Sequence, residues 1–104
     1  MYEVYRTNRF NKETGKLSKE DINRVEKIIF QLKENPYVGD QLQIKSLREK
    51  RLNGKRIYYL VFDDLHSILM IATSDKKAQQ KIIDFIRDNI NLYRDNLKNL
   101  IKDN

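Results

Sequence analysis

Cysteine is absent from this chain of 104 residues, and histidine occurs once. Without cysteine the chain has no disulfide framework, no thiolate zinc site and no cysteine nucleophile. A single histidine excludes a histidine-rich metal site and a pair of histidines acting as acid and base. We therefore expect no metal and no cofactor, and one small domain stabilised by its own hydrophobic core.

Long hydrophobic runs are also absent. The longest apolar run covers residues 57–62, whereas a helix that spans a bilayer needs roughly 20 apolar residues. The chain does not start with the basic and then apolar pattern of an export signal. We therefore expect a cytoplasmic protein that does not bind a membrane.

Charged residues are abundant, with 21 basic and 15 acidic side chains and a formal net charge of +6. The excess is densest in residues 40–62, which hold six basic and only two acidic side chains. Such a region suits a polyanion, because each cation that contacts a phosphate releases counterions. A solvated basic surface explains the charge equally well, so charge alone leaves both interpretations open.

Two elements are predicted in the first third of the chain. Residues 2–10 alternate large and polar side chains, which predicts a strand, and a polar turn is expected over 11–17. Ser18 begins a capping-box-like sequence that is followed by apolar residues at helical spacing. Because the residue before Pro36 disfavours helical geometry, we predict an amphipathic helix over 18–34.

The middle of the chain is predicted to be a β meander. Residues 43–52, 55–62 and 66–74 are strand-like, and Asn53-Gly54 between the first two is a strong hairpin signal. Strands joined by such short turns run antiparallel. We therefore expect an α+β fold with a small, mostly antiparallel, four-stranded sheet, the N-terminal helix packed on one face, and a C-terminal helix.

From Asp75 onward the chain is predicted to be helical, and residues 91–104 are expected to form a C-terminal helical extension. Its apolar residues are spaced by three and four, as in a heptad seam too short for a free coiled coil. Packing of this seam on the sheet or on the first helix is favoured, and the alternative is that its distal half binds a partner or a second copy. The seam consists of Ile83, Ile86, Ile90, Tyr93, Leu97 and Leu100.

Two polar features outside the basic region are interpreted as structural. Asp63 and Asp64 lie between two predicted strands, where adjacent acids more often solvate a turn than hold a metal. His66 follows them without a partner carboxylate at a recognisable spacing. We therefore expect His66 to be structural or exposed rather than catalytic.

The basic hairpin is the main candidate for chemistry. Arg48 and Lys50 are two residues apart in a strand and point to one face, and pairing about the turn is expected to bring Arg56 near Lys50 on that face. Lys76 and Lys77 follow the next strand. Such a cationic cluster can grip a phosphate backbone and stabilise the added charge of a phosphorane during RNA cleavage. It can also bind nucleic acid without cutting it.

The run LREKRLNGKRIYYLVFDDLHSILMIATSDKKAQQ resembles the core of the RelE/ParE toxin superfamily. The shared features are a basic strand, a short glycine turn, an arginine followed by apolar and aromatic residues, an apolar strand, and a basic pair at its end. The resemblance covers about residues 2–90. It implies a single RelE-like toxin domain over 1–104, with a microbial ribonuclease-like fold whose helices pack on one face of the sheet.

The resemblance also implies roles for individual residues. Arg56 matches the arginine that stabilises the transition state, and Lys76 matches a basic residue that contacts phosphate or acts as an acid. Arg48 and Lys50 match paired lysines, one of which assists deprotonation of the ribose 2′-hydroxyl. The family's tyrosine shortly after the last basic residue is missing, since the next tyrosine is Tyr93. The expected substrate contacts are Lys45, Arg51, Lys55 and Lys77.

RelE-type toxins cut messenger RNA in the ribosomal A site and are silenced by an antitoxin. The resemblance thus implies an endoribonuclease that acts on mRNA on the ribosome, with a cognate antitoxin as partner in a homodimer or a heterotetramer. A ParE-like protein that inhibits DNA gyrase by binding is the alternative, and a nucleic-acid-binding domain with no toxin role is a third interpretation. Arg56 is expected to be a surface side chain, so Arg56→Ala should change the free energy of unfolding by only about 0.5 kcal/mol.

Overall fold

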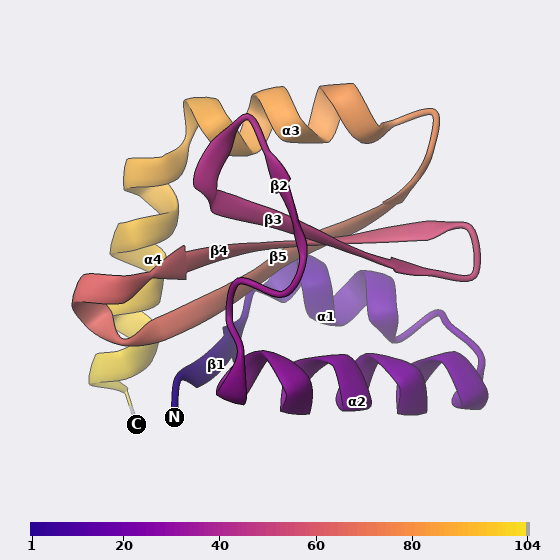
Figure 1. Cartoon of the computed structure of the whole chain (residues 1–104), viewed down its shortest axis with the longest axis horizontal. Helices are drawn as coiled ribbons and strands as arrows, with labels where there is room; N and C mark the ends of the chain where they lie inside the picture. The colour runs from indigo at the N-terminus through magenta and orange to yellow at the C-terminus, as the bar shows by residue number, and fades with distance from the viewer. Residues whose placement is uncertain (104) are drawn as a thin grey trace.

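The computed structural model describes residues 1–103, in which helices cover both faces of one sheet (Figure 1). Helices α1 and α2 pack on one face, and α3 and α4 pack on the other. The elements in chain order are β1 (Glu3–Arg6), α1 (Asn8–Thr14), α2 (Lys19–Glu34), β2 (Asp40–Leu42), β3 (Ile44–Leu52), β4 (Lys55–Phe62), a 3-10 turn (Asp63–Leu65), β5 (Ser67–Asp75), α3 (Gln79–Asp88) and α4 (Ile90–Lys102).

The sheet differs from the predicted one in its number of strands. The prediction of four strands is wrong, and so is the prediction that the helices pack on one face. Within residues 1–103 the sheet has five strands in the order β1-β5-β4-β3-β2. Strands β2 to β5 pair antiparallel, but β1 runs parallel to β5. A period of two in the sequence predicts a strand, but it does not say which edge the strand joins or in which direction.

The first strand is shorter than predicted because Thr7 begins a helix. The Thr7 hydroxyl oxygen accepts a hydrogen bond from the Phe10 amide (3.0 Å), as an N-cap does, and the hydroxyl donates to the Ile71 carbonyl (2.7 Å). The Phe10 side chain is fully buried under the sheet. Residues 2–10 and 11–17, expected as a strand and a turn, therefore contain α1 instead.

Helix α2 confirms the predicted amphipathic helix. The hydroxyl oxygen of Ser18 accepts a hydrogen bond from the Asp21 amide (3.1 Å) and caps the first turn. Val25, Ile29 and Leu32 form its buried stripe against the sheet. The prediction succeeds because cap, stripe and stop signal are all local in sequence.

The predicted hairpin between β3 and β4 is also confirmed. Both turn residues have positive φ, 46° at Asn53 and 78° at Gly54, as a two-residue hairpin turn requires. An additional strand, β2, was not predicted. It turns back into β3 at Gln43, which has a positive φ of 66°, and three residues are too few to show a periodicity.

The C-terminal region forms two helices rather than one, because the chain changes direction at Asn89 (φ −123°, ψ 24°). Of the predicted seam, Ile83, Ile86 and Leu97 are buried in the core against the sheet, and the others are partly buried around it. This confirms the favoured interpretation that the seam packs on the sheet. Residue 104 of the predicted extension lies outside the described residues. Among the helices described, none has the length and apolar character needed to cross a bilayer.

Candidate functional site

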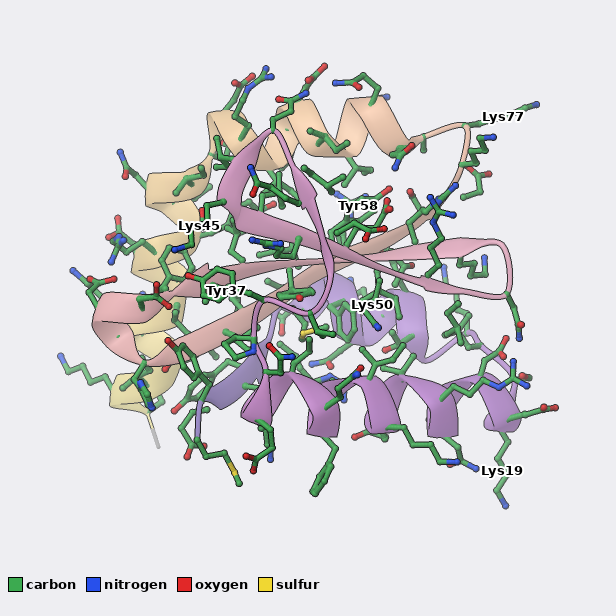
Figure 2. The ribbon with its side chains drawn as sticks, in the orientation of Figure 1. Lys19, Tyr37, Lys45, Lys50, Tyr58 and Lys77 are labelled. Carbon is green, nitrogen blue, oxygen red and sulfur yellow. The ribbon has the colours of Figure 1, made fainter. Side chains whose placement is uncertain are left out.

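The register of the hairpin divides the predicted basic cluster between the two faces of the sheet. Lys50 lies opposite Ile57, and Arg51 lies opposite Arg56. Since neighbours directly across a ladder share a face, Arg56 shares its face with Arg51. The prediction that Arg56 lies near Lys50 on one face is therefore wrong. Figure 2 shows the division, with Lys50 on the α2 side and Tyr58, two residues after Arg56, on the α3 side.

Arg48 lies on the α2 face with Lys50 and is bonded to the backbone. Its Nε donates to the Lys45 carbonyl (2.9 Å), and its Nη1 donates to the carbonyls of Gly39 (3.0 Å) and Tyr37 (3.4 Å). Its guanidinium carbon also lies 5.0 Å from the centre of the Tyr37 ring. These hydrogen bonds connect the segment before β2 to β3, so the Arg48 guanidinium stabilises the fold.

The remaining predicted cations are exposed. Lys45 also lies over the Tyr37 ring, with its Nζ 5.1 Å from the ring centre. Lys76 and Lys77 lie in the turn between β5 and α3, and Lys77 points away from the protein in Figure 2. Since Arg56 pairs with Ser74 in β5, this turn lies at the same end of the sheet as Arg56.

The α3 face carries a buried charged pair, Glu49 and Arg56. Only 2% of Glu49 and 9% of Arg56 are exposed. Arg56 Nη1 lies 3.6 Å from Glu49 Oε2, and the more exposed Arg51 places its Nε 4.0 Å from the same oxygen. Charges that are taken out of water need close partners. The Glu49–Arg56 pair is thus a buried ion pair in which each charge is the nearest partner of the other.

Neutral side chains also lie near this pair. Gln79, the first residue of α3, donates from Nε2 to Glu49 Oε1 (2.7 Å). The Tyr58 hydroxyl is 2.7 Å from the Ser74 hydroxyl. Burial raises the pKa of Tyr58, while the hydrogen bond with Ser74 acts in the opposite direction. Tyr58 therefore stays protonated at neutral pH and can donate a hydrogen bond.

Arg56 is incompletely satisfied by its surroundings. Its Nε and Nη1 are buried, and neither has a hydrogen-bond partner within residues 1–103. A buried N–H group without an acceptor is costly, and guanidinium groups bind oxyanions well. Arg56 can therefore bind an anion, and the Glu49 carboxylate beside it can accept a proton. Together they provide two of the groups that transesterification of RNA requires.

Glu49, Tyr58 and Gln79 were not predicted as site residues. A signal for Glu49 did exist, because a two-residue turn at Asn53-Gly54 places Arg51 opposite Arg56, and Glu49 is two residues before Arg51. Gln79 offered no local signal, since only the packing of α3 brings it to β3.

A second polar cluster lies at the opposite end of the sheet and is fully bonded. The hydroxyls of Tyr2 and Tyr37 donate to the two oxygens of Asp63, at 2.7 Å and 2.6 Å. The bond from Tyr37 and then that from Tyr2 lower the pKa of Asp63. Burial, followed by the bond to Asp63, raises the pKa of Tyr37 to about 12. We call Tyr2, Tyr37 and Asp63 the tyrosine–aspartate cluster.

The neighbours of this cluster have structural contacts. The His66 ring stacks on Tyr2 with 4.2 Å between ring centres, which supports the structural interpretation of His66. Asp64 accepts a hydrogen bond from Arg94 of α4 (2.7 Å), so it connects the turn to a helix rather than only solvating it. Within residues 1–103, no group of three or more acidic or histidine side chains comes together in a way that could hold a metal ion.

Comparisons with known proteins identify the fold. No protein-family model and no curated protein matches the sequence. A chain of the intact RelBE toxin–antitoxin complex from E. coli is similar in structure, with a TM-score of 0.66, 20% identity, and coverage of 72% of this chain and 96% of that chain. Isolated RelE from E. coli has a TM-score of 0.66 and 18% identity, with coverage of 83% of this chain and 99% of that chain.

A third match comes from another organism. The RelBE2 toxin–antitoxin complex of Mycobacterium tuberculosis contains a chain with a TM-score of 0.63 and 20% identity, with coverage of 72% of this chain and 98% of that chain. These similarities show that the chain has a RelE-like toxin fold. The resemblance found in the sequence is thereby confirmed for the fold.

Proposed function

We propose that this protein is the toxin of a type II toxin–antitoxin pair and that it is an endoribonuclease acting at the Glu49–Arg56 pair. The RelE-like fold supports the first part, because two of the similar structures are complexes of such toxins with antitoxins. The observation that carries the second part is the buried guanidinium of Arg56, whose Nε and Nη1 have no acceptor within residues 1–103.

In the proposed reaction the Glu49 carboxylate accepts the proton of a ribose 2′-hydroxyl. The 2′-oxygen then attacks the adjacent phosphorus, and the bond from phosphorus to the 5′-oxygen breaks. Arg56 binds the phosphorane oxygens, on which negative charge increases. Lys76 donates a proton to the leaving 5′-oxygen. The products are a 2′,3′-cyclic phosphate and a 5′-hydroxyl, and the required 2′-hydroxyl restricts the reaction to RNA.

The surrounding cations define the proposed substrate path. Arg51, Lys55 and Lys77 are exposed at the same end of the sheet as Arg56. They can hold the phosphates on either side of the cleaved bond, as point charges or as a guanidinium fork. The proposed substrate is messenger RNA on the ribosome in the cytoplasm, and a cognate antitoxin is the proposed protein partner.

Cleavage of messenger RNA on programmed ribosomes tests this proposal. Glu49→Gln keeps the shape of the side chain but removes the base, and we expect cleavage to fall by a factor of about 100 or more. Arg56→Lys keeps the charge but loses the fork, and we expect a loss of about 100-fold. Lys50→Ala is the control, because Lys50 lies on the opposite face, and it should change cleavage less than about twofold. Unchanged cleavage by Glu49→Gln would refute the assignment.

A second candidate is a ParE-like toxin that inhibits DNA gyrase by binding. One observation favours it: Arg48 and Lys50 lie on the other face of β3, and an acidic residue, Glu49, shares the face of Arg56. A face with this mixture of charges is less suited to phosphate than the predicted cationic cluster. Inhibition of gyrase supercoiling by a parent protein that cuts no RNA would establish this alternative.

A further inference from the structure

The Glu49–Arg56 pair is closed in this structure. Glu49 is 2% exposed and Arg56 is 9% exposed, so a ribose hydroxyl cannot reach the carboxylate without movement of the groups above it. Any ligand of this pair must first displace part of its cover.

Besides Arg56, two side chains lie beside the Glu49 carboxylate, Arg51 and Gln79. Arg51 is a long side chain with 69% of its surface exposed, and its Nε is 4.0 Å from Oε2, beyond hydrogen-bond distance. Gln79 is bonded more closely, with its Nε2 2.7 Å from Oε1. Gln79 is therefore the side chain that holds the cover in place.

At the start of the helix that carries Gln79, the side-chain capping bond comes from Asp75 and not from Ala78. Ala78 at its N-cap has no side-chain capping bond, and the turn before it contains the exposed Lys76 and Lys77. The Asp75 carboxylate accepts a hydrogen bond from the Ala78 amide (3.0 Å), which sets where the turn ends. Release of Gln79 therefore breaks one side-chain hydrogen bond to β3 and leaves this turn bonded at Asp75.

A phosphate that enters this site would form hydrogen bonds with Arg56 that Gln79 does not form. Within residues 1–103 the Gln79 side chain hydrogen-bonds to Glu49, and the buried N–H groups at Nε and Nη1 of Arg56 have no hydrogen-bond acceptor. A phosphodiester oxygen that enters beside Arg56 would supply the missing acceptor and an opposite charge. A protein without such an anion has no equivalent gain, so it stays closed.

We propose that Gln79 is a regulatory residue that keeps the site closed, and that RNA opens the site by displacing the Gln79 amide from Glu49. The consequence for RNA cleavage rests on the proposed function. The closure itself is a property of access to Glu49, and it can be measured without any RNA.

Carbodiimide labelling of carboxylates, followed by peptide mass spectrometry, measures this access on the folded protein. In Gln79→Ala we expect the labelling of Glu49 to rise about fivefold, as loss of one hydrogen bond would give. Gln80→Ala is a matched control, because Gln80 is the next residue of the same helix and its Nε2 donates to the exposed Asp84 (2.9 Å) instead. Its Glu49 labelling should equal that of the parent. Equal labelling of Glu49 in Gln79→Ala and Gln80→Ala would overturn the proposal.

A second variant and a second readout separate the possible failures. Gln79→Glu replaces the donor with a like charge beside Glu49, so the labelling of Glu49 should again rise. In the ribosome cleavage assay, Gln79→Ala should cut faster than the parent by about the same factor as the labelling, whereas a residue that only supports the active structure would slow it. If labelling rises but no variant and no parent cuts RNA, the closure stands and the proposed nuclease function fails.

Discussion

Two arginines of neighbouring strands, Arg48 on the α2 face and Arg56 on the α3 face, differ in how fully their guanidinium groups are hydrogen-bonded. On the α2 face, Arg48 donates to three backbone carbonyls, and the nearby tyrosine–aspartate cluster has every oxygen of its carboxylate bonded. On the α3 face, Arg56 is more deeply buried, yet two of its nitrogens have no hydrogen-bond partner within residues 1–103, although Nη1 is ion-paired with Glu49. Arg48 thus stabilises the fold, whereas Arg56 has N–H groups that can still donate hydrogen bonds to a ligand.

This difference separates a structural site from a candidate binding site. A satisfied polar network adds to stability and has nothing left to offer a ligand. A buried group without partners costs free energy, and such costs concentrate at functional sites. Arg48 of β3 and Arg56 of β4 lie on opposite faces because Arg56 lies across from Arg51, and successive side chains of a strand point to opposite faces.

The largest expected effect is on the α3 face. Arg56→Ala leaves Glu49 buried without its nearest cation, so we expect the free energy of unfolding to fall by about 2–3 kcal/mol, somewhat below the loss from breaking a tight buried ion pair. Urea denaturation measures it. The double variant Glu49→Gln, Arg56→Ala should recover at least about half of the loss, because it also removes the buried charge. A loss near 0.5 kcal/mol, as expected for a surface arginine, would contradict this account.

A smaller effect is expected for Arg48→Ala on the α2 face. The substitution removes two hydrogen bonds to the backbone of the segment before β2 and one to Lys45 of β3. We expect a loss of about 1.5 kcal/mol in the free energy of unfolding. The remaining folded protein should keep its RNA cleavage within about twofold, since Arg48 points away from the candidate site. Lys45→Ala, beside the same tyrosine but exposed, serves as the control and should change stability by less than about 0.5 kcal/mol. A variant with intact stability but abolished cleavage would place Arg48 in the site after all.

The smallest expected effect is a pH dependence at the tyrosine–aspartate cluster. The hydrogen bonds from Tyr37 and Tyr2 lower the pKa of Asp63 below its ordinary 3.8. The unfolded chain therefore binds this proton first on acidification. The resulting stabilisation is present above about pH 4 and is lost as the pH falls through the lowered pKa.

Tyr37→Phe tests this dependence because it removes the hydroxyl that lowers the pKa of Asp63 most. Urea denaturation at pH 7 and at successive values below pH 4 should show a shallower loss of stability in Tyr37→Phe than in the parent. Tyr5→Phe is a control outside the cluster. Identical acid profiles for Tyr37→Phe and the parent would show that the two phenol contacts do not stabilise the charged carboxylate.

Local features of the sequence were sufficient for helix α2 and for the β3–β4 hairpin. A cap, an apolar stripe and a proline define the helix, and Asn53-Gly54 defines the hairpin, all within a few residues of one another. The same local signals predicted the RelE-like fold, through the order of strand types and turns. They also predicted Arg56 as a site residue, but they did not predict that it lies buried beside Glu49.

Local sequence patterns did not predict the contacts between distant segments, which only the tertiary structure shows. The parallel pairing of β1 with β5 joins Glu3–Arg6 to residues more than sixty positions away, and no local period specifies such a partner. The hydrogen bonding of Glu49 depends on α3, whose Gln79 reaches it across thirty residues. A sequence shows that a residue is charged and which strand carries it. Whether that charge is solvated, ion-paired or left with unpaired hydrogen-bond donors depends on which other segments pack over it, because desolvation and hydrogen bonding are set by neighbours in space.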